Sequence, residues 1–181
     1  IKIYLVNLIY KMKLTYFNVR GFAETSRILL AITGQDYEDF RYPLNIIDLA
    51  TFNMEKTEFD AAKKEGKLLS SLNKVPFLEV DGTVIPQSKA IERYIASQGN
   101  MMGDSLLEYA RIDSICECIR DFKDAYQRVR KSENKESEMT KWFTETLPER
   151  LGLLEHIIGR ENNLFSVGNR LSLADVVIYT F

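Results

Sequence analysis

The sequence changes its pattern near residue 98, and this change is the strongest constraint on the fold. Before it, strand-like and helical segments alternate, and after it the periodic segments are all helical. The Asp81-Gly82 pair between two short apolar runs is typical of a β-hairpin. The order βαβ followed by ββα predicts a small α/β layer. Its expected elements are a strand at 13–18, a helix at 22–33, a strand at 37–42, a loop at 43–58, a helix or turn at 59–68, strands at 76–80 and 83–85, and a helix at 88–97.

The longest helix that we expect, at 105–130, carries apolar residues on an unusually wide face. Two neighbouring stripes together cover more than half of its circumference, which is wider than the single stripe of a surface helix. The pattern therefore predicts burial on two sides, against the helix's own domain and against a partner chain. The two stripes are Tyr109, Ile112, Cys116, Ile119 and Tyr126, and Ile115, Cys118, Phe122, Ala125 and Val129.

Two further helical segments complete the second half. A run at 137–159 contains Pro148, which we expect to kink or break the helix. Ser172 and Asp175 form a capping-box pattern that starts a last helix, and that helix runs to the end of the chain. We expect the chain to be cut inside its helical domain, and residues 1–11 to be an extension before a natural start at Met12. The residues expected to pack in the 137–159 run are Phe143, Leu147, Leu151, Leu154 and Ile158.

Charge and cysteine usage exclude several classes of function. The 24 Lys and Arg residues are balanced by 26 Asp and Glu residues, so we expect no binding to nucleic acid or to a membrane. Cys116 and Cys118 point about 200° apart on a helix, which disfavours a bridge or a shared metal. Two free thiols are typical of a reducing compartment, so we expect a cytoplasmic protein. His156 is the only histidine, and no triad or zinc spacing surrounds it.

Four segments, in order along the chain, carry recognisable motifs: LTYFNVRGFAE (14–24), KVPFLEVDG (74–82), PQSKAIERYI (86–95) and VGNRLSLAD (167–175). Together they resemble the sigma class of cytosolic glutathione transferases. The resemblance implies a thioredoxin-like glutathione-binding domain at 12–97, a linker at 98–104 and an all-helical domain at 105–181. It also implies a homodimer that uses glutathione as co-substrate with a small hydrophobic electrophile.

Tyr16 is the residue to which the resemblance assigns catalysis. Taken without the surrounding motif, it would be a strand aromatic that packs in the core. An unperturbed thiol with a pKa of about 8.5 is only a few per cent ionised at neutral pH. A phenol keeps its proton at that pH and can donate it to a thiolate, and a shift of about two units corresponds to roughly 2.7 kcal/mol.

The resemblance also implies a glutathione site on the 74–82 and 86–95 segments. The Val75-Pro76 peptide is expected to be cis, so that the Val75 backbone pairs with the cysteinyl unit of glutathione. Lys74 is expected near the glycyl carboxylate, although a solvated loop lysine would give the same pattern. Gln87 and Ser88 are expected to bind the γ-glutamyl end at a helix N-terminus, and Ser88 also fits an N-cap.

The helix at 105–130 contributes the last implied contact with glutathione. Asp121 lies on its polar face, where the ordinary interpretation is a solvated carboxylate. By resemblance it reaches the glutathione amino group of the other subunit. Metal-responsive relatives carry three aspartates here, and this chain has Glu117, Arg120 and Asp121. We expect no metal, because the arginine opposes a cation; ion pairs such as Glu117–Arg120 and Asp124–Arg128 are expected instead.

Other departures from the class concern the substrates. The only tryptophan is Trp142, so no tryptophan is available in the loop that contacts the glycyl end, and Phe59, Lys63, Lys64 and Lys67 are the candidates to replace it. Phe22 stands where prostaglandin-forming relatives have an arginine, which disfavours that chemistry. We expect Phe17, Val19 and Phe22 to line an apolar pocket for the second substrate.

Three functions remain open at this stage. The first is conjugation of the glutathione thiolate to a small electrophile, or reduction of an organic peroxide by the same thiolate. The second is a glutathione-dependent isomerase of the prostaglandin type. The third is a homologue without catalysis, kept as a crystallin-like protein or a ligand carrier.

Overall fold

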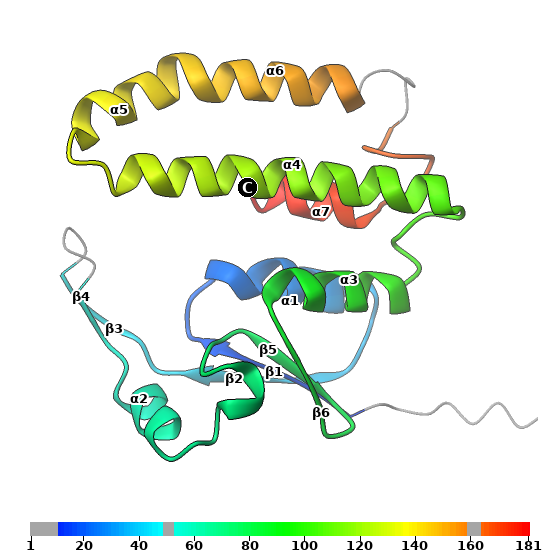
Figure 1. Ribbon diagram of the computed structural model, residues 1–181. Coiled ribbons are helices and arrows are strands. Elements are labelled where there is room, and N and C mark those ends of the chain that lie inside the picture. Colours follow the sequence, from blue (N-terminus) through cyan, green and yellow to red (C-terminus); the bar gives the residue numbers. More distant parts are fainter. Residues whose placement is uncertain (1–10, 49–52, 159–163) are drawn as a thin grey trace, which may run out of the picture. The chain divides into compact units, whose positions relative to one another are not determined.

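The computed structural model describes residues 11–48, 53–158 and 164–181, which form two compact units. The first unit ends at Ile95 and the second begins at Ala96 (Figure 1). The expected extension at 1–11 lies, except for Lys11, outside the described residues. Among the helices of the described ranges, none combines the length and the apolar character that a bilayer crossing requires.

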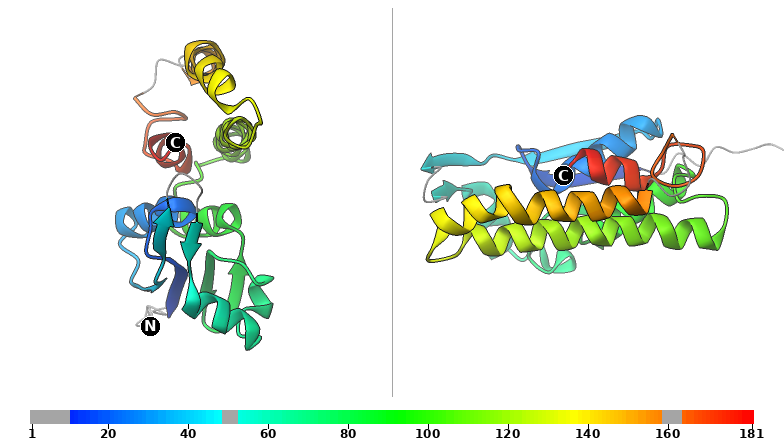
Figure 2. Two further views of the ribbon diagram at one scale, coloured as in Figure 1. Left: turned by 90° about the vertical axis from the view of Figure 1, so that its left-hand side faces the viewer. Right: turned by 90° about the horizontal axis from the view of Figure 1, so that it is seen from above.

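A four-stranded mixed sheet forms the centre of the first unit, in the order β2-β1-β5-β6. The strand β1 runs parallel to β2, while β5 runs antiparallel to both β1 and β6. The helices α1 and α3 cover one face of this sheet (Figures 1 and 2). The predicted βαβ and ββα order is thereby confirmed. The bounds are β1 Met12–Phe17, α1 Glu24–Ile32, β2 Tyr37–Tyr42, β5 Phe77–Val80, β6 Thr83–Pro86 and α3 Ser88–Gln98.

The segment 43–58, expected as a loop, contains two short strands. β3 (Asn45–Asp48) and β4 (Asn53–Glu55) pair antiparallel as a separate ribbon, and α2 (Thr57–Lys64) follows. The prediction of a loop was wrong because every residue of both strands is exposed. A strand that buries neither face has no alternation of apolar and polar residues for a sequence to reveal.

The second unit is helical, and its longest helix, α4 (Leu106–Arg130), packs against α5 (Lys135–Lys141), α6 (Leu147–Ile158) and α7 (Leu173–Tyr179) (Figure 2). Ser105 caps α4 by accepting a hydrogen bond from the Glu108 N–H. Most of the wide apolar face is buried within this chain, although Tyr109 is 39% exposed, so the width of the face does not by itself require a partner. The side chains of α4 that are buried in this way are Ile112, Ile115, Cys116, Ile119, Phe122 and Ala125.

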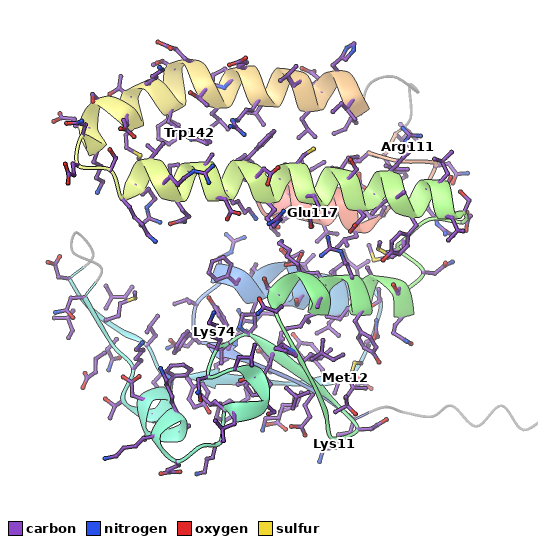
Figure 3. The ribbon with its side chains drawn as sticks, in the orientation of Figure 1. Lys11, Met12, Lys74, Arg111, Glu117 and Trp142 are labelled. Atoms are coloured by element: carbon purple, nitrogen blue, oxygen red, sulfur yellow. The ribbon has the colours of Figure 1, made fainter. Side chains whose placement is uncertain are left out.

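A π-helical turn, Trp142–Thr146, separates α5 from α6, and Pro148 explains why it forms there. A proline has no N–H and its ring collides with the carbonyl four residues earlier, so the chain widens before it. The predicted kink or break at Pro148 corresponds to this π-helical turn in a continuous helical segment, but the buried set differs. Trp142 is buried and points toward α4 (Figure 3), whereas Phe143 and Leu151, both predicted to pack, are 52% and 42% exposed.

The predicted capping box at the start of α7 is present. Asp175 accepts hydrogen bonds from the backbone N–H and the hydroxyl of Ser172, at 2.8 Å each. The same carboxylate accepts from the N–H and hydroxyl of Ser166, at 2.7 and 2.6 Å. One side chain therefore starts the helix and ties it to the preceding loop.

Candidate functional site

Three of the predicted site residues lie next to one row of paired residues in the sheet. Thr15 pairs with Phe77 across β1 and β5, and Phe77 pairs with Pro86 across β5 and β6. The next residues in that register are Tyr16, Pro76 and Gln87. Adjacent strands lie about 4.8 Å apart. The three residues therefore stand side by side at one end of the sheet.

Tyr16 is 6% exposed, and its hydroxyl meets the turn that follows β1. The Phe22 N–H donates a hydrogen bond to the Tyr16 Oη at 3.2 Å. Gly21, at a φ of +40°, makes this approach possible, because a Cβ there would lie 2.6 Å from the same oxygen. The phenol oxygen thus accepts one hydrogen bond, and its own hydrogen is left to be donated elsewhere.

Arg27 of α1 was not predicted as a site residue, yet its guanidinium holds the end of β1 and the chain that leads into this turn. It donates to the Val19 carbonyl at 2.8 Å and to the Phe17 carbonyl at 3.3 Å. It is 8% exposed and paired with Asp39 of β2, the two groups approaching to 3.1 Å. Opposite charges at apolar-facing positions of two neighbouring elements are the signal that would have revealed the pair.

The Val75-Pro76 peptide is cis, as predicted. Lys74 is exposed in the loop before β5 (Figure 3), so its ammonium group is open to solvent. Val75 packs on an apolar cluster of the first unit, which anchors the loop. That cluster consists of Tyr42, Phe59, Ala62 and Leu68, with Phe17, Phe40, Val75 and Phe77 packed against it.

Gln87 and Ser88 lie where β6 meets α3. The Gln87 carbonyl accepts from Ala90 and Ile91 N–H groups at 3.0 and 3.1 Å, so Gln87 occupies the cap position. Ser88 is the first residue of the helix and not its N-cap, which corrects the alternative interpretation of that serine. Gln87 has a φ of +75°, a left-handed conformation that costs a non-glycine residue about 1–3 kcal/mol and is concentrated at ligand sites.

The residues predicted for the second substrate differ in their exposure. Phe22 is 64% exposed and therefore presents its ring to solvent, whereas Phe17 packs on Phe59 with ring centroids 5.1 Å apart. Val19 is half-buried. Phe59 is 6% exposed and forms part of the cluster, so its ring is core. Among the candidates to replace the loop tryptophan, only the lysines are exposed: Lys63, Lys64 and Lys67.

Asp121 belongs to the second unit and is exposed on α4. Its neighbour Arg120 forms the predicted ion pair with Glu117 at 2.6 Å, and the Arg120 guanidinium also lies 3.7 Å from Asp121. Asp124, expected to pair with Arg128, lies 4.0 Å from Arg120. Within the described ranges, no group of three or more His, Cys, Asp or Glu side chains is gathered for a metal ion. The Arg120 guanidinium lies at the centre of this acidic face.

Two pKa values shift around Asp39. Burial, with the Asp39 carboxylate as the second cause, raises the pKa of Tyr37 above its usual value. The pKa of Arg41 is raised chiefly by its hydrogen bond to Asp39. The Asp39 carboxylate is shared between a buried guanidinium, Arg27, and a more exposed one, Arg41.

The sheet row and the helical unit that follows it define the class of protein. Residues 12–97 match the N-terminal domain of glutathione S-transferases, and residues 120–181 match the C-terminal domain of the same family. The chain belongs to the glutathione S-transferase family, an enzyme family that uses glutathione as co-substrate. The resemblance of the four sequence segments, and the thioredoxin-like and helical fold that it implied, are confirmed.

Individual relatives differ in what they are named for. Hematopoietic prostaglandin D synthase from Gallus gallus is 35% identical over 164 residues, covering 90% of this chain and 73% of its own length. S-crystallin 3 from Enteroctopus dofleini is 31% identical over 181 residues, covering 92% and 77%. A solved nematode-specific glutathione transferase from Caenorhabditis elegans has a TM-score of 0.78 at 28% identity, covering 94% and 79%.

Proposed function

We propose that this protein activates the thiol of glutathione through Tyr16 and joins the sulfur to a small apolar electrophile. The observation that supports the proposal is the row of Tyr16, Pro76 and Gln87 at one end of the sheet. In that row, Tyr16 has a nearly buried phenol whose oxygen already accepts a hydrogen bond. Its hydrogen is thereby left for a ligand atom in front of the row.

Tyr16 acts as a hydrogen-bond donor to the sulfur. The O–H···S bond favours the thiolate, and the thiol proton passes to solvent. A shift of about two pKa units requires roughly 2.7 kcal/mol, within the range of about 1.5–3 kcal/mol for a hydrogen bond to a charged group. The thiolate then attacks the electrophile: a C–S bond forms, and the leaving group departs with the electron pair of the bond that breaks.

The same thiolate accounts for peroxide reduction. The sulfur attacks one oxygen of an organic hydroperoxide, the O–O bond breaks, and the alkoxide takes a proton to leave as an alcohol. The resulting glutathione sulfenic acid condenses with a second glutathione to give the disulfide and water. Both reactions need the donor at Tyr16 and no further group at the sulfur.

Glutathione is held as an extended strand beside the site. The Val75 N–H and C=O pair with the cysteinyl backbone, in the manner of strand addition. The γ-glutamyl carboxylate lies at the N-terminus of α3, beside Gln87 and Ser88, where helix N–H groups have no intrahelical partner. Lys74 supplies a positive charge for the glycyl carboxylate. The left-handed backbone of Gln87 supports this assignment.

The second substrate is proposed to bind against Phe22 and Val19. Phe22 offers an exposed ring in the turn that also touches the Tyr16 hydroxyl. Phe17 supports this surface without contacting the substrate directly, because its ring packs on the core cluster. An apolar side chain at position 22 favours uncharged electrophiles.

The active form is proposed to be a cytoplasmic homodimer in which Asp121 binds the amino group of glutathione held by the other subunit. Asp121 is 67% exposed on α4, so its carboxylate is available to a second chain. Cys116 and Cys118 form no disulfide, which fits a reducing compartment. Sedimentation velocity tests the dimer, and a monomer with full activity would overturn both the dimer and the role of Asp121.

Conjugation of glutathione to an aromatic halide tests the function, with wild type, Tyr16→Phe and the control Tyr37→Phe. Tyr37 begins β2 and pairs with Met12, at the end of the sheet opposite the row. We expect kcat at pH 7 to fall by about 25-fold in Tyr16→Phe, the loss of thiolate that a rise of the thiol pKa from about 6.5 to about 8.5 produces, and to stay unchanged in the control. Glutathione binding without turnover in wild type would indicate a carrier. The absence of any binding would refute the glutathione assignment.

A further inference from the structure

The Arg27 guanidinium is buried against the chain that surrounds Tyr16. It is 8% exposed and its donors reach two carbonyls that precede the turn: Val19 at 2.8 Å and Phe17, the last residue of β1, at 3.3 Å. The Asp39 carboxylate accepts a hydrogen bond from the Arg27 Nε at 3.1 Å. The guanidinium carbon also lies 6.0 Å from the centre of the Tyr16 ring.

Such a group has a cost that packing alone does not explain. Desolvating a cation opposes folding, and a buried ion pair is often no more stable than apolar residues of the same volume. Arg27 follows the buried Ser26 and precedes the fully buried Leu29 and Leu30. An apolar side chain would fit this pattern of burial. The donors of Arg27 are, however, directed at the segment that ends in the Phe22 N–H.

We propose that Arg27, oriented by Asp39, is a positioning residue that sets the hydrogen-bond geometry of Tyr16. The inference rests on the proposed function of Tyr16. By fixing the carbonyls of Phe17 and Val19, the guanidinium holds the following turn so that the Phe22 N–H stays 3.2 Å from the Tyr16 Oη. With that acceptor position filled, the phenolic hydrogen is directed toward the glutathione sulfur.

The requirement is for an arginine and not merely for a positive charge. A guanidinium presents several N–H donors in a rigid fork, and here they reach a carboxylate and two backbone carbonyls of different residues. A lysine ammonium is a single point on a flexible stem and cannot span these acceptors. Arg27→Lys therefore keeps the charge that Asp39 needs and removes the positioning.

Arg41 provides a matched control. It binds the same carboxylate, with its Nε 2.8 Å from Asp39 Oδ2, but its side chain is 46% exposed. Arg41→Lys makes the same chemical change at the same partner. In Arg27→Lys we expect the pKa of bound glutathione to rise by about one unit and kcat at pH 7 to fall by about threefold, as the thiolate fraction falls. We expect glutathione affinity to change less than about twofold, and Arg41→Lys to match wild type in all three measurements.

A double-mutant cycle separates positioning from general loosening of the fold. In the Tyr16→Phe background, Arg27→Lys should leave the pKa of bound glutathione unchanged, because the group through which it acts is gone. An equal shift in both backgrounds would overturn the inference, as would a wild-type pKa in the Arg27→Lys single variant. If Arg27→Lys does not fold, Asp39→Asn takes its place, with the same expected rise. A wild-type protein that does not lower the thiol pKa at all would instead refute the proposed function.

Discussion

Gly21→Ala tests how closely the turn must approach the phenol of Tyr16. The added methyl would lie 2.6 Å from the Tyr16 Oη and 3.0 Å from its Cε1, so the ring must move. Overpacking of this kind costs about 1–3 kcal/mol, and the left-handed backbone at position 21 adds about 1–2 kcal/mol. We therefore expect a loss of about 2–5 kcal/mol in the free energy of unfolding, and a fall in kcat of about tenfold or more as the Phe22 N–H and the phenol separate.

Gly34→Ala is the matched control for that experiment. Gly34 also has a left-handed backbone, at a φ of +63°, but a Cβ there meets nothing within 4 Å. It should lose about 1–2 kcal/mol and keep full activity. Urea denaturation gives the stabilities, and conjugation of glutathione to an aromatic halide gives kcat. Equal losses in the two variants, with equal activity, would refute the close packing of Gly21 on Tyr16.

Three other expected outcomes concern a titration, a helix start and the second substrate. The pKa of Tyr37 is raised in the folded protein, so the free energy of unfolding falls as the pH rises above the usual tyrosine value of about 10. Urea denaturation at pH 8 to 11 should therefore show Tyr37→Phe losing less stability than wild type. A parallel loss would refute this. Asp175→Asn should cost about 2–4 kcal/mol through its four hydrogen bonds, against less than about 0.5 for the exposed Asp124→Asn; equal small losses would contradict it. Phe22→Ala should raise KM for an apolar electrophile several-fold without moving the pKa of bound glutathione, because the N–H remains; a shifted pKa would implicate the ring itself.

Periodicity predicted most of the fold because most elements bury one face. The bounds of β2 agree with the prediction at both ends, and α4 differs by one residue, where Ser105 acts as cap. The ribbon of β3 and β4 was missed because it buries nothing. The width of the apolar face on α4 was read correctly, but a pattern on one helix cannot say whether its own chain or another covers it.

For the site, local motifs predicted the residues, but the contacts between them depend on register and turn geometry. The positions of Tyr16, Pro76 and Gln87 were available from sequence, whereas their alignment in one row requires the pairing of three strands. The contribution of Phe22 was expected from its side chain, and its backbone N–H proves to be the group that touches the phenol. Arg27 was missed because a single arginine in a helix is usually a surface residue.

The pKa of glutathione bound to the wild-type protein tests the central claim most directly. Thiolate absorbs in the ultraviolet, so a pH titration of the glutathione complex, corrected for the free protein, gives that value. If the Tyr16 hydroxyl donates to the sulfur, half-ionisation should occur about two units below the pKa of about 8.5 for an ordinary thiol, and Tyr16→Phe should return it toward that value. A bound thiol that ionises no more readily than free glutathione would contradict the account.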